Sequence, residues 1–219
     1  MLKRFLSLIL LTCTMLVLPV HATPLLQAVA TNDLEAVQNI LKDPAKLAWL
    51  ESRDELGRTP LLLATDHNRI AIARALIAAG ANVNAKDSRQ DSPYLLAGAQ
   101  GRLEILKMTL AHGADLGSTN RYGGTALIPA AERGHVAVVR TLIDAGVKVD
   151  HINRLGWTAL LEAIILSDGG TRHQEIVRML IAAGADVNLA DKDGVTPLQH
   201  ALRRNYTTMT TMLRSAGAH

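Results

Sequence analysis

The sequence has few aromatic residues and almost no cysteine. Aromatic residues make up 3% of the 219 residues, although hydrophobic residues make up 48%. A chain that is hydrophobic but poor in large rings favours thin layers packed from Ala, Leu, Val and Ile over one central globular core. The single cysteine, Cys13, lies in an N-terminal segment that we expect to be removed. The mature chain would therefore contain no disulfide, even if it is exported.

The sequence also lacks the residue patterns that indicate common enzymes and metal sites. It contains no HExxH pair, no paired cysteines, no GxxxxGK[ST] phosphate loop and no GxSxG nucleophile turn. The histidines beyond the N-terminal segment are spread along the chain: His67, His112, His135, His151, His173, His200 and His219. We therefore expect no catalytic residue, no metal site and no cofactor, and a chain that is not an enzyme.

One enzymatic alternative concerns Glu162, Asp168 and His173, which are close enough in the sequence to approach one another. The sequence offers no nucleophile and no enclosed cavity beside them, and water-excluded chemistry needs such a cavity. We interpret the grouping as coincidence. An enzyme here would need a deep pocket around Glu162.

The sequence also lacks a large excess of positive or negative charge. The formal net charge is +3, and removal of Lys3 and Arg4 with the N-terminal segment leaves 21 basic and 20 acidic residues. Proteins that bind nucleic acid usually carry a clear basic excess. We therefore expect no nucleic-acid partner.

The N-terminus has the features of a cleaved signal peptide at residues 1–22. Lys3 and Arg4 precede an apolar run over residues 5–18, and Ala22 follows Val20 and His21 at the predicted cleavage site. The apolar run is short for a membrane-spanning helix, so we expect no membrane association after cleavage. Thr12 before Cys13 disfavours a lipoprotein. The sequence predicts a periplasmic protein, with full secretion as the alternative.

The rest of the chain is repetitive. Hydroxyl residues that can cap a helix recur every 33 residues, at Thr59, Ser92, Thr125 and Thr158, and further copies begin at Thr23 and Thr196. The end of each unit recurs too, as AAGANVN, AHGADLG, DAGVKVD and AAGADVN. Each unit contains a turn, a short helix and a longer helix with apolar residues at helical spacing. Residues 23–219 therefore form one domain of six repeats, with approximate bounds 23–53, 54–86, 87–119, 120–152, 153–190 and 191–219.

This pattern resembles the ankyrin repeat, whose period is 33 residues and whose first helix opens with T-P-L-x-x-A. The best matches are Thr59-Pro60-Leu61 with Ala64 and Thr196-Pro197-Leu198 with Ala201. The resemblance covers essentially all of the mature chain. It implies an all-α solenoid of about six stacked helix-turn-helix repeats joined by β-turn fingers.

Several units depart from the common pattern. Gln90 replaces the glycine of the turn, and Pro129 lies four residues after the expected cap Thr125. The first repeat ends in an apolar extension after Asp43 and Pro44 that carries Leu47, Trp49 and Leu50. We interpret this extension as a cover for the N-terminal end of the stack rather than a binding role for Trp49. About five additional residues lie between the two helices of repeat 153–190, around the glycines of the segment 167–172. This segment is either a functional loop or a tolerated insertion.

The resemblance also implies a binding surface. In ankyrin arrays the finger residues before the capping Thr and the exposed side of each first helix line a concave groove. Two features carry over to this chain: arginines on successive fingers and an apolar patch that includes Leu166. The predicted partner-binding residues are Arg58, Arg89, Arg121, Tyr122, Arg154, Leu155, Trp157, Ile165 and Lys192. Aromatic residues and arginines of this kind are typical of interface hot spots, although Trp157 could instead pack across its own finger.

We therefore expect a non-enzymatic, monomeric protein whose concave face binds another protein. The chain is similar to small periplasmic ankyrin proteins of bacteria, and this similarity implies that it assists or stabilises an envelope protein or a protective enzyme. The alternative is a secreted effector that binds a host protein. The same surface would serve either role.

Overall fold

The computed structural model describes residues 23–44 and 46–219. The predicted signal peptide, residues 1–22, lies outside the described residues. The described residues form thirteen α-helices and no strand, which confirms the all-α prediction. None of these helices is both long enough and apolar enough to cross a membrane. The described part of the chain also contains no group of three or more His, Cys, Asp or Glu residues placed to hold a metal ion.

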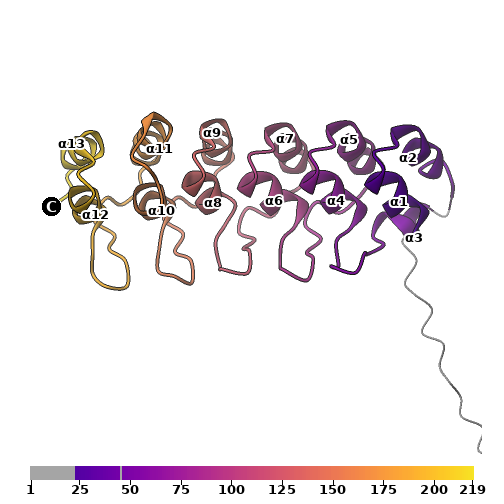
Figure 1. Ribbon diagram of the computed structural model, residues 1–219, viewed down its shortest axis with the longest axis horizontal. Coiled ribbons are helices and arrows are strands. Elements are labelled where there is room, and N and C mark those ends of the chain that lie inside the picture. Colours follow the sequence, from indigo (N-terminus) through magenta and orange to yellow (C-terminus); the bar gives the residue numbers. More distant parts are fainter. Residues whose placement is uncertain (1–22, 45) are drawn as a thin grey trace, which may run out of the picture.

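The helices form two parallel rows along an elongated stack (Figure 1). The row of first helices comprises α1 (Pro24–Ala30), α4 (Pro60–Asp66), α6 (Pro93–Ala99), α8 (Leu127–Glu132), α10 (Ala159–Ile165) and α12 (Pro197–Arg203). The row of second helices comprises α2 (Leu34–Ile40), α5 (Ile70–Ala78), α7 (Leu103–Ala111), α9 (Val136–Asp144), α11 (Thr171–Ala182) and α13 (Thr207–Ser215). Each helix contacts its partner in the same repeat and its equivalents in the adjacent repeats, so the apolar core is continuous along the stack.

The short helix α3 (Lys46–Leu50) packs against α1 at the N-terminal end of the stack. Leu50 is buried, and Trp49 is partly buried against the core. A terminal repeat has only one neighbour and must cover its own outer face. The position of α3 agrees with the interpretation of this segment as a cover.

Side-chain caps begin five of the six first helices. In each of these the hydroxyl of the residue before the helix accepts a hydrogen bond from the backbone N–H three residues later. These caps are Thr23, Thr59, Ser92, Thr158 and Thr196. Each capping residue also accepts, through its carbonyl, the N–H four residues later. The first turn is thus fixed by two bonds from one residue.

The predicted cap at Thr125 is wrong. Its hydroxyl is buried and has no hydrogen-bond partner, and α8 begins after Ala126 instead. The cause is Pro129, which occupies the position four residues after Thr125 and has no N–H to donate. The N–H of Ile128 therefore bonds to the Thr125 carbonyl at 3.3 Å, and the hydroxyl loses its donor.

Five fingers of five residues each connect the repeats and project from the row of first helices (Figure 1). They span residues 54–58, 87–91, 120–124, 153–157 and 191–195. Each begins with Asp or Asn, whose side-chain oxygen accepts the N–H groups two and four residues later. The fourth residue has a positive φ, which glycine tolerates best. Gln90 takes the same conformation, with φ of 66°, so the finger keeps its shape without a glycine.

The insertion in repeat 153–190 is partly helical. Helix α11 contains 12 residues, compared with 9 in α5, α7 and α9. The short segment before it is held in place because the Tyr206 hydroxyl donates to the Ser167 carbonyl at 2.6 Å and the Gln174 amide donates to the Gly169 carbonyl at 2.7 Å. The inserted residues therefore form an additional helical turn and a hydrogen-bonded loop.

Candidate partner-binding groove

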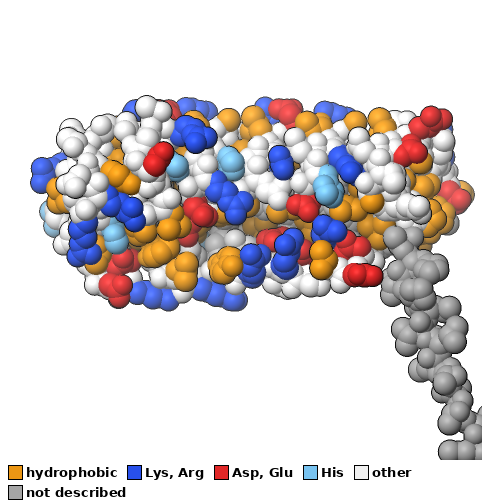
Figure 2. All heavy atoms as spheres, viewed as in Figure 1, with side chains coloured by type: hydrophobic (Ala, Val, Ile, Leu, Met, Phe, Trp, Pro, Cys, Tyr) orange, Lys and Arg blue, Asp and Glu red, His pale blue; other side chains and the backbone are white. Residues whose placement is uncertain are grey.

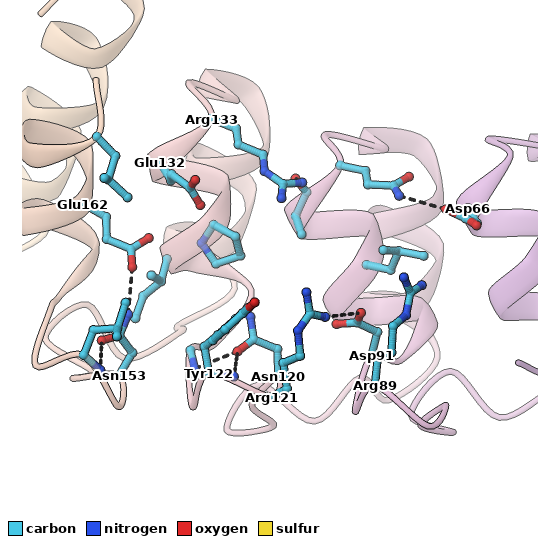
Figure 3. Close-up of a pocket in the computed structure, with 18 of the residues that line it drawn as sticks. Asp66, Arg89, Asp91, Asn120, Arg121, Tyr122, Glu132, Arg133, Asn153 and Glu162 are labelled. Atoms are coloured by element: carbon cyan, nitrogen blue, oxygen red, sulfur yellow. Dashed lines mark hydrogen bonds and ion pairs between the residues drawn. The ribbon is translucent and has the colours of Figure 1, made fainter. Parts of the chain in front are cut away.

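The fingers and the first helices of repeats 54–86 to 153–190 enclose a groove of about 580 Å³ (Figure 3). Its walls come from the fingers on one side and from the exposed sides of α4, α6, α8 and α10 on the other. The residues that line it are Leu56, Arg58, Asp66, Arg89, Asp91, Leu96, Ala99, Gln100, Asn120, Arg121, Tyr122, Gly124, Ile128, Pro129, Glu132, Arg133, Asn153, Leu155, Glu162 and Leu166. The groove is open and elongated, a shape that suits a polypeptide segment.

The structure brings five of the nine predicted binding residues into this groove: Arg58, Arg89, Arg121, Tyr122 and Leu155. It does not bring Arg154, Trp157, Ile165 or Lys192 into the lining. Ile165 retains only 9% of its surface and Trp157 is half-buried. Their role in partner binding remains a prediction.

The arginines in the groove are largely engaged by the protein itself. Arg58 forms ion pairs with Asp54 at 2.7 Å and with Asp66 at 3.1 Å. Arg89 lies 3.5 Å from Asp87. The two Arg58 pairs hold its guanidinium between its own finger and α4, so Arg58 offers a partner fewer free donors than the sequence suggests.

Arg121 forms a different arrangement, because it pairs with Asp91 at 3.4 Å and also lies 4.6 Å from the centre of the Tyr122 ring. Burial raises the pKa of Asp91, and the neighbouring Asp87 acts in the same direction, whereas Arg121 opposes them. Arg121 thus stabilises the charge of Asp91 in the previous finger and at the same time orients the Tyr122 ring.

Arg154 and Lys192 connect successive fingers. Arg154 donates to the Arg121 carbonyl at 2.9 Å, and Lys192 donates to the Arg154 carbonyl. Their aliphatic chains lie against Gly123 and Gly156, where a Cβ atom would collide with them. Both side chains therefore fix the spacing of the fingers.

Exposed apolar side chains gather at one part of the groove. Tyr122, Leu155 and Leu166 retain 53%, 51% and 48% of their surface. In the space-filling view, hydrophobic side chains gather at the finger side of the α8 and α10 repeats, beside basic ones (Figure 2). Clustered apolar surface of this kind marks interaction sites more often than isolated exposed residues do.

Sequence reasoning did not assign Glu162 to the groove. It is 5% exposed, and its carboxylate accepts one hydrogen bond, from the Asn153 amide at 2.7 Å. Burial, reinforced by the charge of Glu132, raises the pKa of Glu162 to about 7, against the opposing effect of Asn153. The repeat register could have indicated its place in the groove. Glu162 is equivalent to Leu96 and Pro129 in the two preceding repeats, and both of these also line the groove.

The structure separates the three residues of the enzymatic alternative. Glu162 bonds to Asn153, whereas His173 lies 3.5 Å from Asp168 and 2.9 Å from the Glu132 carbonyl. No hydrogen bond or ion pair between the described residues links Glu162 to either of them. The three side chains do not form one constellation.

Comparison with known proteins agrees with the repeat pattern. The family described as "Ankyrin repeats (3 copies)" matches residues 7–87 and 94–191, and "Ankyrin repeats (many copies)" matches residues 171–214. The putative ankyrin repeat protein YahD of Escherichia coli is 47% identical over 58 residues. That match covers 26% of this chain and 29% of the relative.

Solved structures of similar proteins cover nearly the whole described stack. An ankyrin repeat domain from Acinetobacter baumannii is 61% identical, with a TM-score of 0.86, and the match covers 90% of this chain and 98% of that one. Another ankyrin repeat protein is 42% identical, with a TM-score of 0.85 and the same coverage. The ankyrin repeat domain of Bcl-3, a member of the IkappaB family, is 27% identical, with a TM-score of 0.80 and coverage of 90% and 87%.

Proposed function

The chain belongs to the ankyrin-repeat family, whose repeats are protein–protein interaction modules, and from this premise we propose that it binds another protein in the groove between its fingers and first helices. The observation that carries the proposal is that Tyr122 and Leu155 on the fingers and Leu166 at the end of α10 all line the groove, each about half exposed. Three large apolar side chains that are exposed together lose contact with water when a partner covers them, which favours binding.

We further propose that the protein acts in the bacterial periplasm as a monomer and assists or stabilises an envelope protein or a protective enzyme. The support is the predicted signal peptide at residues 1–22 and the similarity to small bacterial ankyrin proteins. A secreted effector would use the same groove, so the compartment in which the protein is found distinguishes the two roles.

The test is affinity capture from envelope extracts with the tagged mature protein, residues 23–219. The comparison bait carries Tyr122→Ser and Leu155→Ser, and the control bait carries Leu202→Ser. Leu202 is a matched control because it is 44% exposed but does not line the groove. We expect the partner to be retained by the control and reduced at least about tenfold by the groove variant, since about 1.4 kcal/mol corresponds to a factor of ten.

Capture of the same proteins by all three folded baits would contradict the groove proposal. Fractionation of the producing cells settles the compartment. Protein in the culture medium rather than the periplasm would favour the effector role.

A further inference from the structure

We propose that the segment bound in this groove presents one basic side chain, arginine or lysine, between apolar side chains, and that its cation lies between Glu132 and Glu162. The inference rests on the proposed function, because it specifies the chemistry of the partner at the same site. It follows from the charges that the groove leaves unmatched and from the apolar side chains beside them.

Charges in the groove balance everywhere except at one end. Asp66 pairs with Arg58, and Asp91 pairs with Arg121. Glu132 makes no side-chain hydrogen bond or ion pair with any described residue. Glu162 accepts only the neutral amide of Asn153. These are the two groove-lining carboxylates of the described chain that have no cation beside them.

Arg133, the cation next to Glu132 in the sequence, does not supply the missing partner. Arg133 follows Glu132 directly, but its guanidinium donates to the Ala99 carbonyl of the previous repeat at 2.8 Å. Figure 3 shows Arg133 reaching away from Glu132, while the carboxylates of Glu132 and Glu162 are directed into the same part of the groove. A positive group from outside could therefore approach both carboxylates without displacing an existing ion pair.

The requirement for a cation becomes stronger when a partner covers the site. A bound segment removes water from the carboxylates, and a buried charge without a counter-charge is unfavourable. A neutral or acidic segment would leave two like charges desolvated. A basic side chain forms charge-assisted hydrogen bonds with them instead. The same two groups thus attract one class of segment and reject the others.

The apolar surroundings indicate a polypeptide rather than a small cation. Leu155 and Leu166 line the groove together with the two carboxylates, and Tyr122 adds an exposed ring. The aliphatic part of an arginine or lysine and its apolar neighbours in the chain would cover these side chains. A metal ion would leave them exposed.

The arrangement makes binding sensitive to pH. Glu162 faces Glu132 of α8 and Asn153 of its own finger, and the charge of Glu132 acts with burial to raise its pKa to about 7. On the other elements packed against α10, His173 of α11 is engaged by Asp168 and the Glu132 carbonyl, and His200 of α12 is engaged by Asp191 at 2.7 Å. A bound cation favours the ionised carboxylate, so binding releases a proton from Glu162 and strengthens as the pH rises through 7.

The test is selection of a displayed library of random 12-residue peptides on the tagged mature protein at pH 8. Selected peptides are then measured by fluorescence anisotropy against the wild type and Glu132→Gln/Glu162→Gln. The control is Glu104→Gln/Glu175→Gln, which removes two carboxylates that do not line the groove. Glutamine at position 162 keeps an oxygen that accepts from Asn153, so we expect the variant to remain folded, as circular dichroism will check.

We expect the selected peptides to be enriched in arginine or lysine next to apolar residues. Their affinity should fall at least tenfold for the groove variant and change less than twofold for the control. Their affinity for the wild type should also fall between pH 8 and pH 5.5, and Glu162→Gln should abolish most of this pH dependence. Absence of basic enrichment, including a library that yields no binder, would overturn the inference.

A third variant separates this inference from the proposed function. If Tyr122→Ser/Leu155→Ser abolishes peptide binding while Glu132→Gln/Glu162→Gln does not, the groove binds segments but the cation assignment is wrong. If neither variant matters, the peptides bind elsewhere and both proposals fail for these ligands.

Discussion

At the scale of single residues, Pro129 has an effect four positions away from itself. Its missing N–H leaves the Thr125 carbonyl to the N–H of Ile128, and this leaves the Thr125 hydroxyl buried without a partner. The other first helices have no proline at this position, and their capping hydroxyls are satisfied. Threonine thus has opposite energetic effects in two repeats: the buried hydroxyl of Thr125 has no partner, whereas the hydroxyl of Thr158 caps α10.

Valine should therefore have opposite effects at Thr125 and Thr158. Thr125→Val removes an unsatisfied buried hydroxyl and keeps the shape of the side chain, so we expect the free energy of unfolding to rise by about 0.5–1 kcal/mol. Thr158→Val removes the cap of α10 and should lower it by about 1 kcal/mol. Urea denaturation at pH 7 measures both. Equal destabilisation by the two substitutions would show that the Thr125 hydroxyl has a partner.

Glu162 should make the stability of the protein depend on pH. Its pKa is raised from 4.5 to about 7 in the folded protein, so over this interval the folded state holds a proton that the unfolded chain has released. The free energy of unfolding therefore falls as the pH rises from about 4.5 to about 7. The decrease should be on the order of 1–3 kcal/mol, because one pKa unit corresponds to about 1.4 kcal/mol.

Glu162→Gln should remove this part of the pH dependence. We expect the variant to match the wild type at pH 4 and to be more stable at pH 8, as measured by urea denaturation. Glu104→Gln on α7 is the control, since Glu104 is exposed and forms an ion pair with Lys107 at 3.4 Å. A variant that is less stable than the wild type at pH 8 would show that the ionised carboxylate is stabilised in the free protein.

At the scale of elements, the fingers keep one geometry despite different sequences. The leading Asp or Asn of each finger fixes two backbone N–H groups, and the positive φ at the fourth residue closes the turn. Gln90 adopts this conformation without being a glycine, because the hydrogen bonds of Asp87 and the contacts between fingers hold it there. A side chain in the left-handed region costs about 1–2 kcal/mol.

Gln90→Gly should relieve this strain. We expect a net gain of about 0.5–1 kcal/mol in the free energy of unfolding, because the greater freedom of glycine in the unfolded chain offsets part of the relief. Gln38→Gly in α2 is the control, and there glycine should destabilise by about 1 kcal/mol. Thermal and urea denaturation measure both. A loss of stability at position 90 would show that the glutamine side chain itself stabilises the finger.

At the scale of the whole molecule, the repeat period was sufficient to predict the stack. The recurrence of Thr59, Ser92 and Thr158 fixed the phase of the first helices, and the apolar spacing within each unit predicted the second ones. The same register predicted a groove, and Arg121, Tyr122 and Leu155 line the groove that the structure contains. That they bind a partner stays a prediction. What repeats in the sequence was predictable because each unit packs against neighbours of the same kind.

Interactions that cross from one repeat to another were not predictable in the same way. Arg154 and Lys192 appeared free in the sequence, because nothing in their own unit shows that a long side chain reaches a carbonyl of the previous finger. The acidic end of the groove depends on Glu132 of α8 and Glu162 of α10, which are 30 positions apart. The Thr125 error has a different cause, because it comes from the missing N–H of Pro129 within the same repeat.

Ring side chains at the contacts between adjacent repeats indicate which repeats the array should tolerate losing or gaining. The ring of His135 lies against Gly101, and that of His173 lies against Gly134. If recombination within the gene excised the 33 codons for residues 120–152, His173 would meet Gly101, a surface already shaped for an imidazole. Excision of repeat 153–190 would instead place the phenol of Tyr206 against Gly134, which is shaped for the smaller ring. Loss or duplication of repeat 120–152 would therefore keep a histidine against a glycine at the new contact. Loss of repeat 153–190 would not, because Tyr206 fits its own partner Gly169.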